Sequence, residues 1–111
     1  MANDNYDFEV ACALLDKKSY EELWSYALPY AKSGDSNAQC LIAFLHQFGF
    51  GVPTDLDEAE RWLRYAAHRN NPIAWNNLGT LLVAKGEKEE AKRCYQKAVE
   101  LGFLSATHLA K

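Results

Sequence analysis

Small residues recur along this chain at a spacing of 36 residues. Ala38 begins one round of the pattern and Ala74 begins the next, and Ala43 and Gly79 repeat the same offset. A period of about 20 to 50 residues is typical of repeat proteins, in which each unit is a helix pair that buries its apolar face against its neighbours. Such stacks normally present a binding surface and no catalytic centre. The pattern therefore predicts a binding module.

The composition fits one compact domain over residues 1–111. The chain has 111 residues, of which 49% are hydrophobic, enough to build a core. Its net charge of −3 comes from interleaved acidic and basic side chains, which argues against nucleic acid or anionic lipid and slightly favours a basic protein partner. No run approaches the roughly 20 apolar residues of a membrane span, and the first residues lack a leader pattern. We expect a cytoplasmic protein with no membrane partner.

Capping residues and glycines divide the chain into helices. Ser19 and Ser36 each begin a capping box, Asp55 offers a similar start, and Asn71 precedes a proline. Apolar residues follow helical spacing in every segment, and no segment shows the alternation of a strand. The predicted helices span residues 5–16, 19–33, 37–48, 56–69, 72–85, 87–101 and 104–111. The fold class is therefore all-α, with about three antiparallel helix hairpins and a C-terminal capping helix.

Comparison of the units locates one longer connection, residues 48–54, in the middle hairpin. The small residues Ala11, Ala43 and Gly79 fall at matching positions in the first helices of the three pairs. Because the distance between packed helices depends on the side chains at their contact, we expect these residues to let the two helices of a hairpin lie close together.

Two family resemblances follow from longer motifs. The first motif resembles the Sel-one-like repeat, and its residues are Ala38-Gln39, Gly49-Phe50-Gly51-Val52-Pro53, Asp55, Ala59, Trp62 and Ala66-Ala67. The next unit resembles the tetratricopeptide repeat in Ala74-Trp75, Leu78-Gly79, Gly86, Ala91, Tyr95 and Ala98. Together they cover about residues 36–106. The resemblance implies a right-handed α-solenoid, a superhelix of antiparallel helix pairs that binds other proteins.

In such a superhelix the first helix of each pair lines the concave face, which gives a predicted binding site. Its residues are Phe8, Cys12, Phe44, Gln47, Phe48, Asn76, Thr80 and Val83, with Leu15 and Cys40 beside them. An apolar face of this kind suits an amphipathic helix from a partner or from an identical subunit, which would make a homodimer. Asn77 matches an asparagine that grips carboxylate termini in the family, but the basic residues of that clamp are missing. The alternative is that Phe44 and Phe48 pack within the superhelix.

The three tryptophans differ in their expected roles. Trp62 and Trp75 fall at motif positions and should be structural. Trp24 lies off the inner stripe of its helix, so we expect it to face outward, on a surface that Tyr20 and Tyr65 could share.

No group of residues has the spacing of a catalytic or metal site. Cys12, Cys40 and Cys94 lack C-x-x-C spacing and lie in apolar segments, where a reduced thiol packs as a small hydrophobe. Cys40 and His46 stand six residues apart on one predicted helix, a rise of about 9 Å, so they cannot pair. Acidic residues gather in first helical turns, where the helix dipole favours them. The sequence therefore predicts no enzyme, no cofactor and no metal.

Two functions remain open. The first is a cytoplasmic adaptor or scaffold that binds another protein. The second is an immunity protein that binds and inhibits a cognate bacterial toxin, which the shortness of the chain slightly favours. An immunity protein should bind very tightly and abolish its partner's activity, whereas an adaptor leaves that activity intact.

Overall fold

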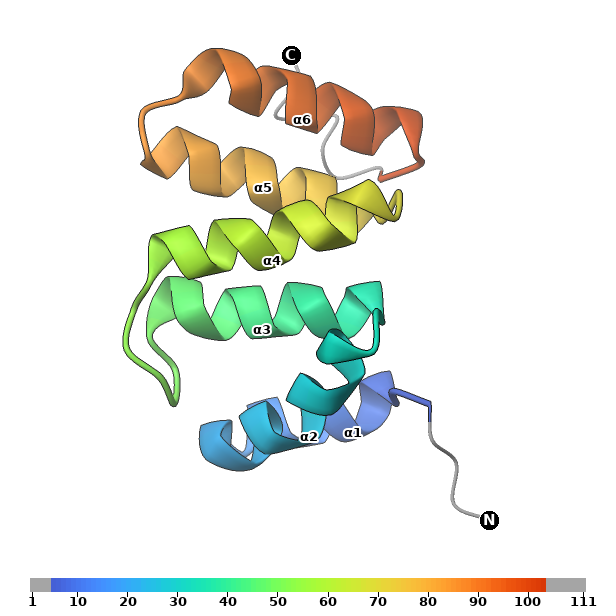
Figure 1. Cartoon of the computed structure of the whole chain (residues 1–111), viewed down its shortest axis with the longest axis vertical. Helices are drawn as coiled ribbons and strands as arrows, with labels where there is room; N and C mark the ends of the chain where they lie inside the picture. The colour runs from blue at the N-terminus through green and yellow to red at the C-terminus, as the bar shows by residue number, and fades with distance from the viewer. Residues whose placement is uncertain (1–4, 104–111) are drawn as a thin grey trace.

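The computed structural model describes residues 5–103, and in this part of the chain it is built from α-helices alone. In chain order they are α1 (Phe8–Asp16), α2 (Tyr20–Lys32), α3 (Ser36–Phe48), α4 (Leu56–His68), α5 (Pro72–Ala84) and α6 (Lys88–Glu100). Successive helices pack as hairpins along one axis, in a body that measures 44 × 29 × 23 Å (Figure 1). This confirms the all-α stack of three hairpins. The terminal helix expected at 104–111 lies outside the described residues.

Local capping sets most of the helix starts. Asp55 Oδ1 accepts a hydrogen bond from the backbone N–H of Glu58 at 3.0 Å, and Asn71 Oδ1 accepts from Ile73 and Ala74 at 2.9 and 3.2 Å. Both starts are as predicted. The cap of α3 is different, because Asp35 occupies it and accepts from the N–H of Ala38 at 3.0 Å. The capping box assigned to Ser36 was therefore wrong by one residue.

One other cap and one other start also differ from the prediction. Ser19 stands at the cap of α2 but makes no side-chain hydrogen bond there. Helix α1 begins at Phe8 and not at residue 5, because Asp7 caps it with a bond from the N–H of Glu9 at 2.8 Å. The backbone N–H of Asp7 donates to the Tyr26 hydroxyl at 2.8 Å, which ties the cap to α2. A local cap and a contact between helices thus hold this start.

Close helix packing depends on the small residues. Ala43 is fully buried, and a Cβ added to Gly79 would lie 2.7 Å from a ring carbon of Tyr95 in α6. No side chain larger than hydrogen fits at Gly79 without moving that ring. The expectation that this glycine lets α5 approach α6 is confirmed.

The longer connection between α3 and α4 packs on the start of α2. The ring of Phe50 stacks on Tyr20, with ring centres 4.8 Å apart. Gly51 has φ +78°, and a Cβ there would lie 2.8 Å from Cβ of Tyr20. The second glycine of the loop therefore serves both the turn and the contact between units.

The tryptophans are only partly as expected. Trp62 and Trp75 are half-buried against the main core cluster, which confirms their structural role. Trp24 is also half-buried, and its ring lies edge-on to His46 of α3 with centres 5.1 Å apart. The prediction that Trp24 faces outward was wrong, because α3 covers that side of α2. Tyr65 is 53% exposed and contacts Trp62 instead.

None of the helices between residues 5 and 103 combines the length and the apolar character needed to cross a membrane.

Candidate functional site

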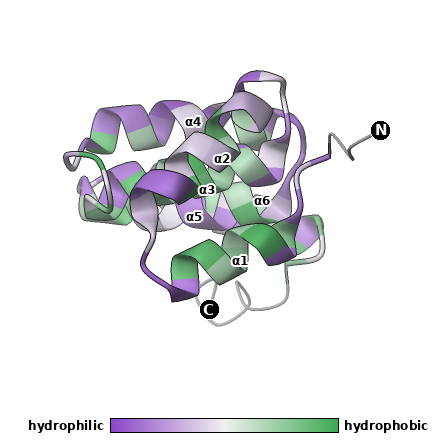
Figure 2. Ribbon diagram, turned by 90° about the horizontal axis from the view of Figure 1, so that it is seen from below, coloured by the Kyte–Doolittle hydropathy of each residue, from purple (hydrophilic) through white to green (hydrophobic). Residues whose placement is uncertain are grey.

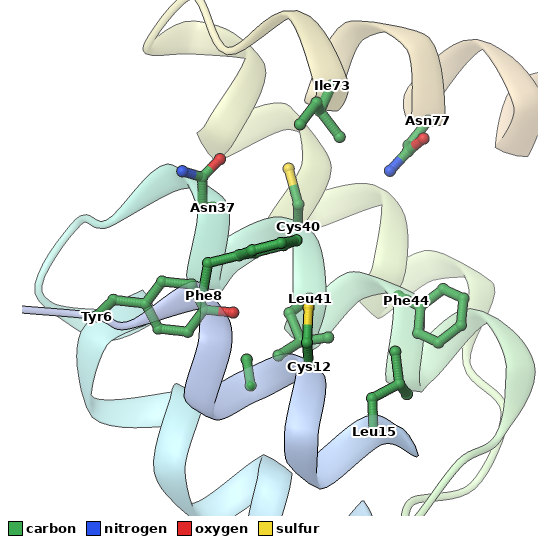
Figure 3. Close-up of a pocket in the computed structure, with 11 residues that line it drawn as sticks. Tyr6, Phe8, Cys12, Leu15, Asn37, Cys40, Leu41, Phe44, Ile73 and Asn77 are labelled. Atoms are coloured by element: carbon green, nitrogen blue, oxygen red, sulfur yellow. The ribbon is translucent and has the colours of Figure 1, made fainter.

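The first helices of the three hairpins, α1, α3 and α5, enclose an apolar hollow of about 350 Å³. Phe8 and Cys12 reach into it from α1, Cys40 and Phe44 from α3, and Ile73 from α5 (Figure 3). We call it the α1–α3–α5 hollow. Its volume lies at the lower end of the range of ligand pockets, about 300 to 1,000 Å³.

A second hollow of about 190 Å³ adjoins the first. Phe44 and Asn77 line both hollows, so the two lie side by side, and we call them together the inner groove. Gln47, Phe48, Leu63 and Thr80 complete the second hollow. Seen along the stack, the ribbon of α1 is largely hydrophobic and that of α4 largely hydrophilic (Figure 2). Among the described residues, five of the seven exposed large hydrophobic side chains lie on α1, α3 and α5, namely Phe8, Val10, Phe48, Ile73 and Val83.

Six of the eight predicted site residues line the inner groove. Phe8 and Cys12 line the first hollow, Phe44 lines both, and Gln47, Phe48 and Thr80 line the second. Leu15 and Cys40, expected beside them, also line the first hollow.

The other two predicted residues, Asn76 and Val83, line neither hollow. Asn76 donates a hydrogen bond from Nδ2 to Oδ1 of Asn77 at 3.3 Å, and Val83 is 47% exposed beyond the groove. Asn77 and Ile73 take the inward positions on α5 instead. The repeat itself could have identified them, since they stand 36 residues after Leu41 and Asn37, which also line the hollow.

The phenylalanines of the groove both pack and stay accessible. Phe8 is 69% exposed and Phe48 is 52% exposed. Phe44 is half-buried, with its ring centre 5.0 Å from that of Phe48 and 5.7 Å from that of Phe50. Contacts within the stack therefore cover part of the Phe44 side chain and little of the Phe8 side chain. The exposed rings leave an unpaired apolar surface at the groove.

The thiols of the core are poor nucleophiles. Burial, with a smaller contribution from the charge of Asp35, raises the pKa of Cys40 to about 12. Burial likewise raises the pKa of Cys94 to about 11. A thiol is reactive as its thiolate, so both side chains stay in the unreactive form at neutral pH. The His46 ring lies against Trp24, in the contact between α2 and α3.

The polar groups that line the groove are amides, the hydroxyls of Tyr6 and Thr80, and the thiols of Cys12 and Cys40. The Thr80 hydroxyl is hydrogen-bonded to the Tyr95 hydroxyl at 3.1 Å. Within residues 5–103, no three His, Cys, Asp or Glu side chains lie close enough together to hold a metal ion. The arrangement can therefore contribute apolar contacts and neutral hydrogen bonds to a ligand.

Comparison with known proteins places the last two hairpins in two families. The model of the Sel1 repeat matches residues 36–71, which hold α3 and α4, and that of the tetratricopeptide repeat matches residues 72–101, which hold α5 and α6. Repeats of these families are typically protein–protein interaction modules, and such scaffolds are generally non-catalytic. Comparison with curated protein sequences gives no significant match.

Two solved structures are similar to the chain. A Sel1 repeat protein from Oxalobacter formigenes is 31% identical with a TM-score of 0.74, over 81% of this chain and 38% of that protein. The protein c5321, a protective antigen present in uropathogenic Escherichia coli strains, displays an SLR fold. It is 25% identical with a TM-score of 0.75, over 82% of this chain and 20% of that protein. This chain therefore spans well under half of either structure.

The motifs, the hairpin stack and both family matches agree that this is a repeat protein, with a Sel1 repeat at residues 36–71 and a tetratricopeptide repeat at residues 72–101.

Proposed function

We propose that the chain is a non-catalytic adaptor that binds another protein through the inner groove. The observation that carries the proposal is the pair of adjoining, mainly apolar hollows on α1, α3 and α5, with the exposed side chains of Phe8 and Phe48 among their lining residues. Apolar surface left open on a soluble domain usually marks a contact site. Large aromatic side chains are also frequent anchors of protein interfaces.

Other occupants fit the groove less well. Nucleic acid needs a basic surface, but α1, α3 and α5 hold no Lys or Arg. A carboxylate terminus would lack a cation for the same reason. An identical subunit remains a second candidate occupant of the groove. We also propose, as a separate point, that the protein is cytoplasmic.

The experiment that tests the proposal is a quantitative pull-down from the native cell extract with a groove variant, Phe44→Asp combined with Thr80→Arg. We expect the partner that the unmodified protein captures to be lost. The matched control combines Tyr65→Asp with Gln96→Arg, which places the same new charges at exposed positions outside the groove. It should retain the partner. Circular dichroism must first show that both variants are folded.

Retention of the same partner by the folded groove variant would refute the groove as the binding site. If the pull-down captures only the protein itself, light scattering of the purified chain should give the mass of a dimer. That result would identify the occupant as a second copy.

The inhibitor alternative predicts a further result with the same captured partner. An immunity protein would abolish the activity of that partner at stoichiometric ratio, and its affinity would be very high. An adaptor would leave the activity unchanged. Nothing in the groove geometry favours inhibition over adaptor binding, so the adaptor is the function proposed.

A further inference from the structure

The helices around the inner groove carry almost no charge. Helices α3 and α5 have 13 residues each and contain no Asp, Glu, Lys or Arg. Charged side chains are concentrated on α4 and α6, where they pair with one another, as in the contact of Arg64 with Glu90 at 3.1 Å. His46, on α3, is turned to Trp24 of α2. A carboxylate entering the groove would therefore find no cation.

Helix α1 adds two acidic side chains, Glu9 and Asp16, and no basic one. They stand three residues before and four residues after Cys12, so they share one side of the helix with it. Cys12 lines the α1–α3–α5 hollow. Both carboxylates are exposed, and neither makes an ion pair or side-chain hydrogen bond within the described part of the chain. Neither carboxylate lines the hollow itself, and we call the two, which lie beside Cys12 on α1, the acidic rim.

The polar side chains that line the hollow are neutral, and one of them is the amide of Asn77. Asn77 Oδ1 accepts from Nδ2 of Asn76 at 3.3 Å. This leaves Nδ2 of Asn77 pointing toward the hollow, with Cys40 and Phe44 nearby (Figure 3). The amide can donate to a neutral acceptor, but it cannot neutralise a charge.

We infer that the groove selects a partner helix by charge as well as by shape. The occupant is an amphipathic helix that places bulky apolar side chains in the α1–α3–α5 hollow, has no acidic residue on its contact face, and carries Lys or Arg beside α1. This inference rests on the proposed function of the groove. It adds the electrostatic character of the partner.

Two physical arguments support this occupant. Burial of a carboxylate without a counter-charge is costly, so an acidic contact face is excluded. Basic residues at the rim meet Glu9 and Asp16 in solvent, where opposite charges chiefly raise the association rate and set specificity. A helix is the occupant that we infer because its apolar side chains at i, i+3, i+4 and i+7 can together fill an apolar groove.

The test uses a phage-displayed library of helical peptides with fixed apolar residues at i, i+3, i+4 and i+7 and equal frequencies of Lys, Glu, Gln and Ser at the other positions. Peptides that bind the folded protein are retained. Peptides that also bind the groove variant, Phe44→Asp combined with Thr80→Arg, are removed. We expect the enriched peptides to carry Lys in clear excess over Glu. Fluorescence anisotropy then measures the affinity of one enriched peptide as free peptide.

The rim is tested with Glu9→Lys combined with Asp16→Lys. We expect about tenfold weaker peptide binding at low salt, since each exposed ion pair contributes modestly, and a smaller loss at high salt because of screening. The matched control is Glu89→Lys with Glu100→Lys, the second and last residues of α6, just as Glu9 and Asp16 are the second and last residues of α1. The control should bind as the unmodified protein does. If the reversed rim fails to fold, Glu9→Gln with Asp16→Asn should give a smaller loss in the same direction.

The outcomes separate this inference from the proposed function. Equal enrichment of Glu-rich peptides, or unchanged binding to the reversed rim while the groove variant loses binding, would overturn the charge selection and leave the groove as a binding site. If no enriched peptide depends on the groove residues, both the charge selection and the groove proposal fail.

Discussion

At the scale of single residues, Gly79 shows how tightly the repeat constrains the sequence. A Cβ at this position would lie 2.7, 2.9 and 3.1 Å from three ring carbons of Tyr95. The ring has little freedom to move, because it is buried and its hydroxyl is hydrogen-bonded to Thr80 at 3.1 Å. The glycine is therefore required by its neighbour on α6 rather than by its own backbone conformation.

Replacement of Gly79 by Ala should lower the free energy of unfolding by about 1 to 2 kcal/mol, because overpacking outweighs the better helix propensity of alanine. Urea denaturation followed by circular dichroism measures the change. In a Tyr95→Leu background the same substitution should become neutral or stabilising, since the ring is gone. A gain of stability from Gly79→Ala in the unmodified protein would contradict the contact.

At the scale of helices, the sequence predicted the features that are set within one helical turn better than those that are set by contacts between helices. Helices α4 and α5 begin where Asp55 and Asn71 were expected to cap them, because a cap depends on bonds within one turn. The start of α1 was missed because the cap of Asp7 was not recognised, although its bond from the N–H of Glu9 also lies within one turn. Most of the groove residues were predicted from the repeat register, but Asn77 was left out of the predicted site, although it stands 36 residues after Leu41, which lines the same hollow.

The caps of α2 and α3 give a matched test of this difference. Asp35→Ala should cost about 1 kcal/mol of stability, because the N–H of Ala38 loses its acceptor. Ser19→Ala occupies the same cap position on α2, where the side chain makes no cap bond. It should cost at most about 0.3 kcal/mol. Thermal melts of the two variants measure the contrast, and equal costs would show that the cap assignments are wrong.

At the scale of the whole molecule, two core clusters are joined in the middle of the stack. One cluster contains Leu23 and Ile42 from α2 and α3, and the other contains Leu63 and Leu81 from α4 and α5. Helix α3 contributes to both clusters, and Trp62 of α4 packs against both. In a repeat stack stability is close to a sum of units and their interfaces, so a defect in the middle affects both ends.

Ala67 lies at this middle position, 3% exposed in the larger cluster. Ala67→Trp should therefore overpack the stack and abolish its cooperative melting transition, because a well-packed core cannot admit so large a side chain. Ala84→Trp at an exposed position of α5 is the matched control and should melt as the unmodified protein does. Differential scanning calorimetry measures the melting transition of both variants. A native-like transition in Ala67→Trp would mean that this face of α4 is open, and the hairpin stack that encloses the inner groove would have to be packed in a different register.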